Sequence, residues 1–284
     1  MTATPELAAG RAGRALTAAH YLRCLDGIAW REALRFVQQR GRFVAALVRP
    51  LVWLFIFAAG FRSVLGVSIV PPYETYILYE VYITPGLVGM IQLFNGMQSS
   101  LSMVYDREMG SMRTLLVSPL PRWYLLLCKL FAGVMVSMLQ VYVFLAIAWF
   151  WEVQPPPAGY LAVVPALFLS GLMLGSLGLL LSSWIKQLEN FAGVMNFVIF
   201  PMFFASSALY PLWRVKESSL LLYRICAYNP FSHAVELVRY ALYGQLNLEA
   251  LLWVAGFLVL FLGLAIYGYD PGRGLMARRG GPAG

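Results

Sequence analysis

The chain has 284 residues, of which 60% are hydrophobic and 12% are charged, and its formal net charge is +8. A soluble domain carries about 25% charged residues, so this chain has too little charge to cover a surface in contact with water. The composition excludes an ordinary soluble enzyme, a disordered chain and a nucleic-acid-binding domain. It predicts an all-α membrane protein whose excess of basic residues lies in cytoplasmic loops.

The N-terminal segment, residues 1–42, is predicted to be cytoplasmic and to contain an amphipathic helix over residues 22–42. At 100° per residue, one face of this helix carries Leu22, Leu25, Ala29, Ala33 and Phe36, and the opposite face carries Arg23, Arg31, Arg35, Gln38 and Arg42. An apolar face opposite a basic face is typical of a helix lying on the membrane surface. A helix packed against the protein's own spans has the same pattern, so both interpretations stay open.

Long uncharged stretches predict the membrane spans, because a helix needs about 20 apolar residues to cross a bilayer. One transmembrane domain over residues 43–269 is expected, followed by a tail at 270–284. Its six predicted spans cover residues 43–62, 81–105, 125–151, 160–183, 190–208 and 250–269.

The distribution of basic residues predicts that both termini are cytoplasmic. The N-terminal segment, the second and fourth loops and the tail together hold 15 Lys and Arg residues, whereas the other three loops hold 5. Cytoplasmic loops of membrane proteins carry the excess of Lys and Arg. An even number of spans then places the tail on the same side as the N-terminus.

The loop between the second and third spans, residues 105–121, is short, mixed in charge and interrupted by the pair Ser118-Pro119. Proline disfavours helical backbone at the residue before it, so a short helix that ends at this pair is expected. Such an element could dock into a groove on a soluble partner, or it could be a plain connector. The turn between the fourth and fifth spans, with Lys186 and Glu189, could add a smaller contact on the same side.

Small residues recur at intervals of four, three and four in the fourth span: Gly171, Gly175, Gly178 and Ser182. These positions share one helical face, and small side chains let two helices approach closely. Packing within one chain and contact with a second copy are both consistent with this face.

The external stretch after the fifth span is expected to form short re-entrant or interfacial helices, because its apolar run is too short to cross a bilayer. Pro211 and the pair Asn229-Pro230 mark turns or helix starts. Glu236 and Arg239 stand three residues apart, so they can pair on one helical face.

The sequence offers no catalytic, cofactor-binding or metal site. It has no GxxxxGK[ST] loop for ATP, only two histidines, and three cysteines that are far apart. No Asp, Glu, Lys or His lies in the middle of a predicted span, where ion-coupled carriers keep such groups. Any transport by this chain is therefore expected to draw its energy from elsewhere, and the chain itself is not expected to be an enzyme.

Two stretches resemble a known family. The run from Glu108 through Gly110, Ser111, Arg113, Leu115-Leu116 and Ser118-Pro119 is similar to the E-x-x-G-T/S…L-L-x-S-P segment of type-2 ABC transporter permeases, although one residue rather than two separates Glu108 from Gly110. A second stretch contains motifs in the same order as in these permeases: residues 206–211, then Asn229-Pro230-Phe231, then Glu236 with Arg239. Relatives often have glycine where this chain has Ser207. The resemblance covers roughly residues 20–270.

The resemblance implies the membrane subunit of an ABC exporter in the cytoplasmic membrane of a bacterium. It implies a cytoplasmic coupling helix after the second span, a homodimer or a heterodimer with a second permease, and two separate ATPase subunits that bind ATP and Mg²⁺. The expected contact with the ATPase comprises Asp106, Arg107, Glu108, Gly110, Ser111 and Arg113, with Lys186 and Glu189 at its edge. The alternatives are a membrane scaffold or assembly factor without transport activity and, with less in its favour, a lipid-modifying enzyme.

Overall fold

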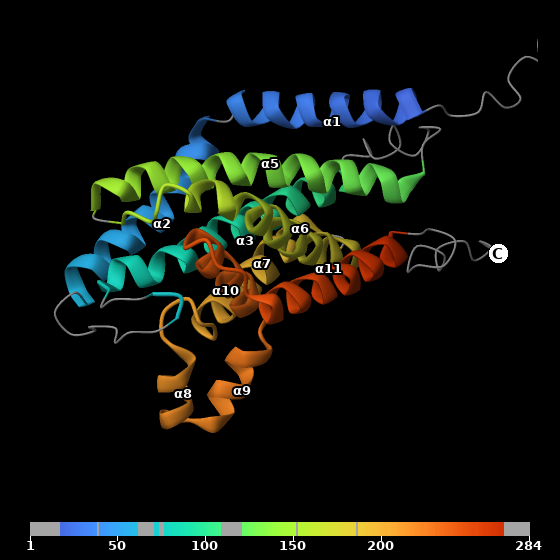
Figure 1. The fold of residues 1–284 in the computed structure, drawn as a ribbon. Helices are drawn as coiled ribbons and strands as arrows, with labels where there is room; N and C mark the ends of the chain where they lie inside the picture. Colours follow the sequence, from blue (N-terminus) through green and yellow to red (C-terminus); the bar gives the residue numbers. More distant parts are fainter. Residues whose placement is uncertain are drawn as a thin grey trace, which may run out of the picture.

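The computed structural model describes residues 18–38, 40–61, 71–73, 77–108, 121–151, 153–185 and 187–269. Every regular element in these ranges is helical, which confirms the predicted all-α fold (Figure 1). The long helices are α1 (Ala18–Gln38), α2 (Arg40–Phe61), α3 (Tyr79–Glu108), α5 (Arg122–Ala148), α6 (Gly159–Trp184), α7 (Leu188–Phe204) and α11 (Leu248–Gly268). The short ones are a 3₁₀ turn (Trp149–Trp151), α8 (Leu212–Ser218), α9 (Leu220–Tyr228) and α10 (Pro230–Leu242).

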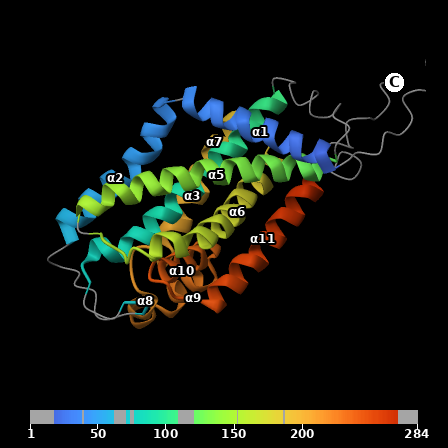
Figure 2. The same cartoon turned by 45° about the horizontal axis from the view of Figure 1, so that its top comes forward.

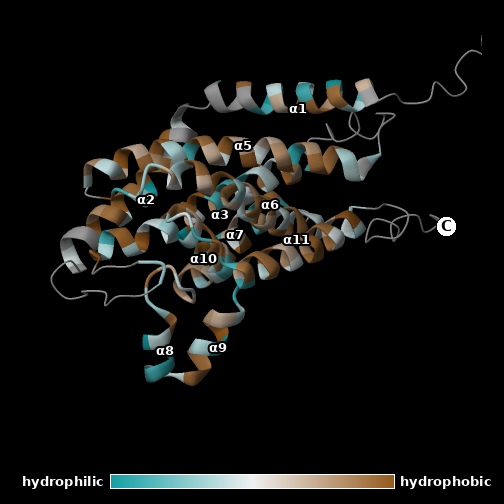
Figure 3. Cartoon of the chain, in the orientation of Figure 1, coloured by the Kyte–Doolittle hydropathy of each residue, from teal (hydrophilic) through white to brown (hydrophobic). Residues whose placement is uncertain are grey.

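A helix lies over each of the six predicted spans, and three of these helices are both long and apolar enough to cross a membrane: α5 with the turn after it, α6 and α11. Figure 3 shows α11 mostly in brown and α5 in brown with paler turns, whereas α1 alternates between polar and apolar residues. The remaining helices, α2, α3 and α7, are less apolar or shorter, so the count of six spans stays a prediction.

The helices form layers around α6. Helices α1 and α2 lie on one side of the molecule, α10 and α11 lie on the other, and α3, α5 and α6 lie between them (Figures 1 and 2). Helix α6 packs against α3, α5, α10 and α11. Its position explains why its small-residue face is needed, because several helices must approach it at once.

Helix α1 packs over the beginning of α5 (Figure 2). The Tyr124 hydroxyl donates a hydrogen bond to the Tyr21 carbonyl at 2.6 Å, and the two rings meet edge to face at 4.9 Å. The apolar side chains of Leu22 and Trp30 are nevertheless exposed. Helix α1 therefore packs against another helix of the chain and also exposes apolar side chains, so both interpretations of this helix remain open.

Helices α8 and α9 form a hairpin that projects from the bundle and contacts mainly itself (Figure 1). Asn229 both ends α9 and caps the beginning of α10, so no residue separates the two helices except Asn229 itself. Its side-chain oxygen accepts a hydrogen bond from the Phe231 N–H at 2.9 Å. Pro230 occupies the first helical position, where its missing N–H costs nothing. After α10 the chain turns at Gly244, whose φ of +69° suits glycine.

Candidate functional site

Of the residues expected to contact an ATPase, those that the structure describes lie at one end of the bundle, where α3 ends and α7 begins; we call this end the coupling end. Asp106 and Arg107 belong to the last turn of α3, and Glu108 is its final residue. Glu189 is exposed in the first turn of α7. Gly110, Ser111, Arg113 and Lys186 lie outside the described residues.

At the coupling end, Glu108 makes a hydrogen bond to α7. Its Oε1 accepts from the Leu188 backbone N–H at 2.9 Å. Leu188 is the first residue of α7, and Gln187 before it provides no side-chain cap. The first N–H groups of a helix have no partner within the helix, and a carboxylate there is also favoured by the helix dipole. Glu108 therefore caps α7 from another helix, and the two segments proposed from sequence as contacts are direct neighbours.

The opposite end of α7 leads into residues 205–211, which carry no helix of their own before α8. The Ser207 carbonyl accepts two hydrogen bonds, from the Tyr82 hydroxyl at 3.0 Å and from Arg239 Nη2 at 2.8 Å. Arg239 is only 2% exposed, pairs with Glu236, and lies over the Tyr82 ring at 4.2 Å. Burial is the largest single influence and lowers the pKa of Arg239, but Glu236 together with Tyr82 and Tyr73 raises it, so that the net pKa lies above its ordinary value and the charge is kept.

Further hydrogen bonds hold the same segment. The Tyr79 hydroxyl donates to the Leu209 carbonyl at 2.7 Å. The Asn229 side-chain amide donates to the carbonyls of Met202 at 2.8 Å and Ala205 at 2.6 Å. Of the five residues singled out from the sequence in the external stretch, Asn229 and Arg239 donate hydrogen bonds to this segment or to the last turn of α7, and Glu236 pairs with Arg239. Pro211 ends the segment, and Pro230 begins α10. Buried backbone groups are therefore paired where the helix stops.

The small-residue face of α6 packs inside the chain. A Cβ on Gly175 would lie 2.5 Å from Leu130 of α5, and one on Gly178 would lie 2.8 Å from the Gly96 carbonyl of α3. A Cβ on Gly171 would lie 3.1 Å from Val134 and 3.2 Å from Gln92. Ser182 is within 2.8 Å of the Tyr269 hydroxyl beyond α11. All four positions thus serve contacts between helices of one chain.

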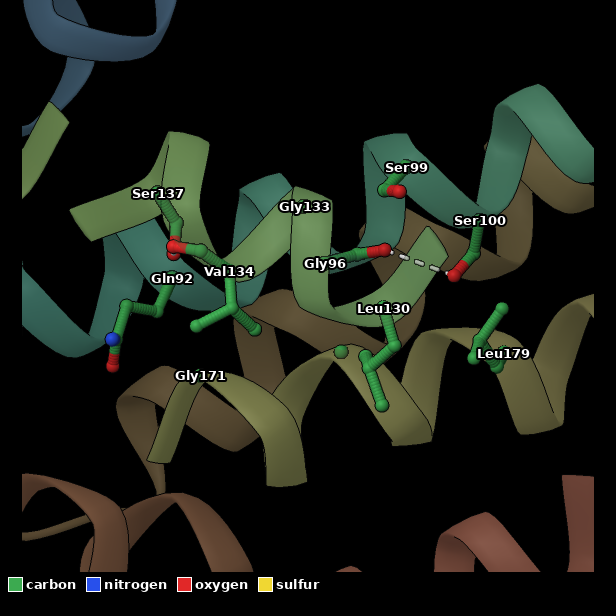
Figure 4. A pocket seen from close by; sticks show the side chains of 11 residues that line it. Gln92, Gly96, Ser99, Ser100, Leu130, Gly133, Val134, Ser137, Gly171 and Leu179 are labelled. Atoms are coloured by element: carbon green, nitrogen blue, oxygen red, sulfur yellow. Dashed lines mark hydrogen bonds between the residues drawn. The ribbon is translucent and has the colours of Figure 1, made fainter. Parts of the chain in front are cut away.

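Polar side chains cross the interface of α3, α5 and α6. Gln92 donates to the Leu167 carbonyl at 2.6 Å and accepts from the Ser170 hydroxyl at 2.7 Å, and Asn95 donates to Gln140. Beside them is a cavity of about 10 Å³, lined by glycines, serines and Gln92 together with the apolar side chains of Leu130, Val134 and Leu179 (Figure 4). A space of that size holds about one water molecule.

The sequence indicated Glu236 as a partner of Arg239 but not Tyr82 or the Ser207 carbonyl, and it did not indicate the side-chain amides of α3 and α5. The search for polar groups in spans considered charged residues and histidine, so Gln92, Asn95 and Gln140 were overlooked although each is visible in the sequence. Tyr79 and Tyr82 gave no signal, because tyrosine is also common at membrane boundaries. Within the described part of the chain, no three His, Cys, Asp or Glu side chains lie close enough to hold a metal ion.

The amino-acid sequence of this chain is similar to those of known transport proteins. A family model described as ABC-2 type transporter matches residues 25–243. The putative transport permease ycf38 of Cyanophora paradoxa is 28% identical over 214 residues, which make up 72% of this chain and 70% of the relative. The probable multidrug ABC transporter permease YbhR of Escherichia coli K12 is 32% identical over 170 residues, 59% of this chain and 45% of the relative. Nodulation protein J of Rhizobium leguminosarum is 29% identical over 85 residues, 30% of this chain and 32% of the relative.

Proposed function

Because the chain belongs to the ABC-2 type transporter family and is the membrane subunit of such a transporter, we propose that it exports a substrate across the cytoplasmic membrane of a bacterium. The energy comes from ATP, bound with Mg²⁺ and hydrolysed by a separate ATPase subunit. The observation that carries the proposal is the family match over residues 25–243 in a chain without a nucleotide-binding GxxxxGK[ST] loop.

The ATPase binds at the coupling end. The proposed contact comprises Asp106, Arg107, Glu108, Gly110, Ser111 and Arg113, with Lys186 and Glu189 beside them. The proximity of Glu108 and Leu188 supports one continuous surface, because it brings the ends of two loops together. Charged side chains on both loops suit recognition of a soluble protein rather than of lipid.

The active transporter contains two copies of this permease, or this permease and a related one, with two ATPase subunits. The chain crosses the membrane six times, and both termini and the coupling end face the cytoplasm. This orientation is supported by the basic residues, 15 of which fall on that side and 5 on the other.

The proposal predicts that an ABC ATPase is encoded beside the gene of this chain, and the test is purification of the two proteins together. The intact pair should copurify, and the permease should stimulate ATP hydrolysis by the ATPase in nanodiscs. The variant Glu108→Arg should lower that stimulation while the amount of purified permease stays unchanged, because it reverses a charge at the contact. A chain that never associates with an ATPase would instead be a membrane scaffold, and normal stimulation with Glu108→Arg would remove Glu108 from the contact.

A further inference from the structure

Helix α3 is hydrogen-bonded to α7 or its flanking residues at both ends. At the coupling end, Glu108 accepts from the Leu188 N–H at 2.9 Å. At the opposite end, Tyr82 and Tyr79 donate to carbonyls of the segment after α7, Ser207 at 3.0 Å and Leu209 at 2.7 Å. The first and last turns of one helix thus hold the two ends of the other.

Helix α3 is the main packing partner of α7 among the described helices. Near the end of α7, the Phe203 and Phe204 rings also meet Trp53 of α2, and the Phe203 ring meets Phe231 of α10. The opposite face of α7 is open: Phe197 is 78% exposed, and Gly193 and Asn196 are exposed with it. The position of α7 therefore depends chiefly on α3 and on the bonds at its two ends.

We infer that Glu108 is a positioning residue that makes α3 and α7 move together. When the ATPase displaces the segment after α3, the bond from Glu108 to Leu188 transmits that displacement to the beginning of α7. Without the bond, α3 moves and α7 is held only by its packing and its opposite end. This inference rests on the proposed function, and it gives Glu108 a task inside the chain that is separate from any contact with the ATPase.

The bond can also be removed from the donor side, at Leu188, whose side chain is not among those proposed to contact the ATPase. The variant Leu188→Pro deletes the backbone N–H that Glu108 binds. Proline suits the first position of a helix, and Gln187 before it already has the extended backbone that proline requires, with φ −98° and ψ 135°. Leu188→Ala is the matched control, because it shortens the same side chain and keeps the N–H. Glu108→Ala removes the acceptor and provides a second route if Leu188→Pro does not fold.

The measurement is the distance between spin labels at positions 197 on α7 and 259 on α11, both of which are exposed. The labelled chain, without its native cysteines, is mixed with an excess of unlabelled chain in the complex with the ATPase, so that distances within one chain dominate. The distance is compared in nanodiscs without nucleotide and after trapping with ATP and vanadate. ATP hydrolysis by each complex is recorded in parallel.

The parent chain and Leu188→Ala should show a change in distance on trapping. Leu188→Pro and Glu108→Ala should lose that change, and Leu188→Pro should keep the stimulated ATP hydrolysis. The chain that carries both Leu188→Pro and Glu108→Ala should lose no more of the distance change than either single variant, because both substitutions remove the same bond. An unchanged distance response in Leu188→Pro would overturn the inference, whatever Glu108→Ala does to ATP hydrolysis, because Glu108 also belongs to the proposed ATPase contact. If the parent chain itself neither binds nor responds to an ATPase, the proposed function fails, and the inference fails with it for that separate reason.

Discussion

The two ends of α7 are held in different ways. At the end that leads to residues 205–211, Ser207 is nearly fully buried, and its carbonyl accepts bonds from Tyr82 and from an arginine that is 2% exposed. At the coupling end, a single bond from the exposed Glu108 reaches the Leu188 N–H. A buried network in low dielectric is rigid and costly to break, whereas an exposed bond exchanges readily with water.

This difference indicates which end is built for stability and which for adjustment. The buried end fixes where α7 stops, because several backbone groups there would otherwise be unpaired. The exposed end can shift with the loops that surround it. A transporter driven from one side of the membrane needs such an asymmetry, since movement has to enter the bundle at one end and be resisted at the other.

Loss of Arg239 should have the largest effect on stability. Arg239→Leu leaves Glu236 without its partner and removes one bond from the Ser207 carbonyl, and breaking a buried ion pair from one side costs about 3 kcal/mol or more. The thermal unfolding midpoint of the purified chain in detergent, followed by tryptophan fluorescence, should fall by many degrees. Arg224→Leu in the projecting hairpin is the control and should change little. Equal midpoints for the two variants would mean that the buried end is not the rigid one.

Crowding at the α3–α6 crossing should have the next largest effect. In Gly178→Ala the new Cβ would lie 2.8 Å from the Gly96 carbonyl, so the two backbones must separate, at a cost of about 1–3 kcal/mol for an overpacked site. The matched control is Gly263→Ala in α11, where nothing lies within 4 Å of the added atom. The control should match or exceed the parent midpoint, because alanine favours helix over glycine. A Gly178→Ala chain as stable as the control would show that this crossing tolerates separation.

Removal of one hydroxyl at the buried end should have a moderate effect. Tyr82→Phe keeps the ring under Arg239 and deletes the bond to Ser207, whose carbonyl still accepts from Arg239. The free energy of unfolding should fall by about 1 kcal/mol, the net value of one hydrogen bond. Urea-dependent unfolding in mixed micelles would measure this free energy. A decrease as large as that in Arg239→Leu would contradict the idea that Arg239 contributes most of the stability of this hydrogen-bond network.

Removal of the bond at the coupling end should have the smallest effect on stability. Leu188→Pro and Leu188→Ala should unfold at the same temperature, because proline leaves no N–H unpaired and the exposed Glu108 carboxylate can accept a hydrogen bond from water instead. A clear loss of stability in the proline variant alone would show that the coupling end is as rigid as the buried one.

The sequence was sufficient for the helical fold because hydropathy is a local property. The uncharged stretches at 160–183 and 250–269 were long enough to define α6 and α11. The pair Asn229-Pro230 likewise predicted the start of α10, since capping depends on adjacent residues. The spacing of Glu236 and Arg239 also allowed the ion pair that the structure contains.

The links between distant helices could not be predicted in the same way. The bond from Glu108 to Leu188 joins residues 80 positions apart, and that from Tyr82 to Ser207 joins residues 125 apart. No sequence motif marks either hydrogen bond, because one partner in each is a backbone group, and backbone groups of that kind occur along the whole chain. The face of Gly171, Gly175, Gly178 and Ser182 was visible in the sequence, but which helices it would meet depended on the packing of the whole bundle.

The most direct test of the account is photo-crosslinking of the segment after α3 in the living cell. A photoreactive phenylalanine is placed at Ser111 in one chain and at Leu221 in α9 in another, each expressed with the neighbouring ATPase. The account predicts that the chain labelled at position 111 crosslinks to the ATPase and that the chain labelled at 221 does not. A crosslink to the ATPase from position 221, or none from position 111 in a complex that copurifies, would contradict it.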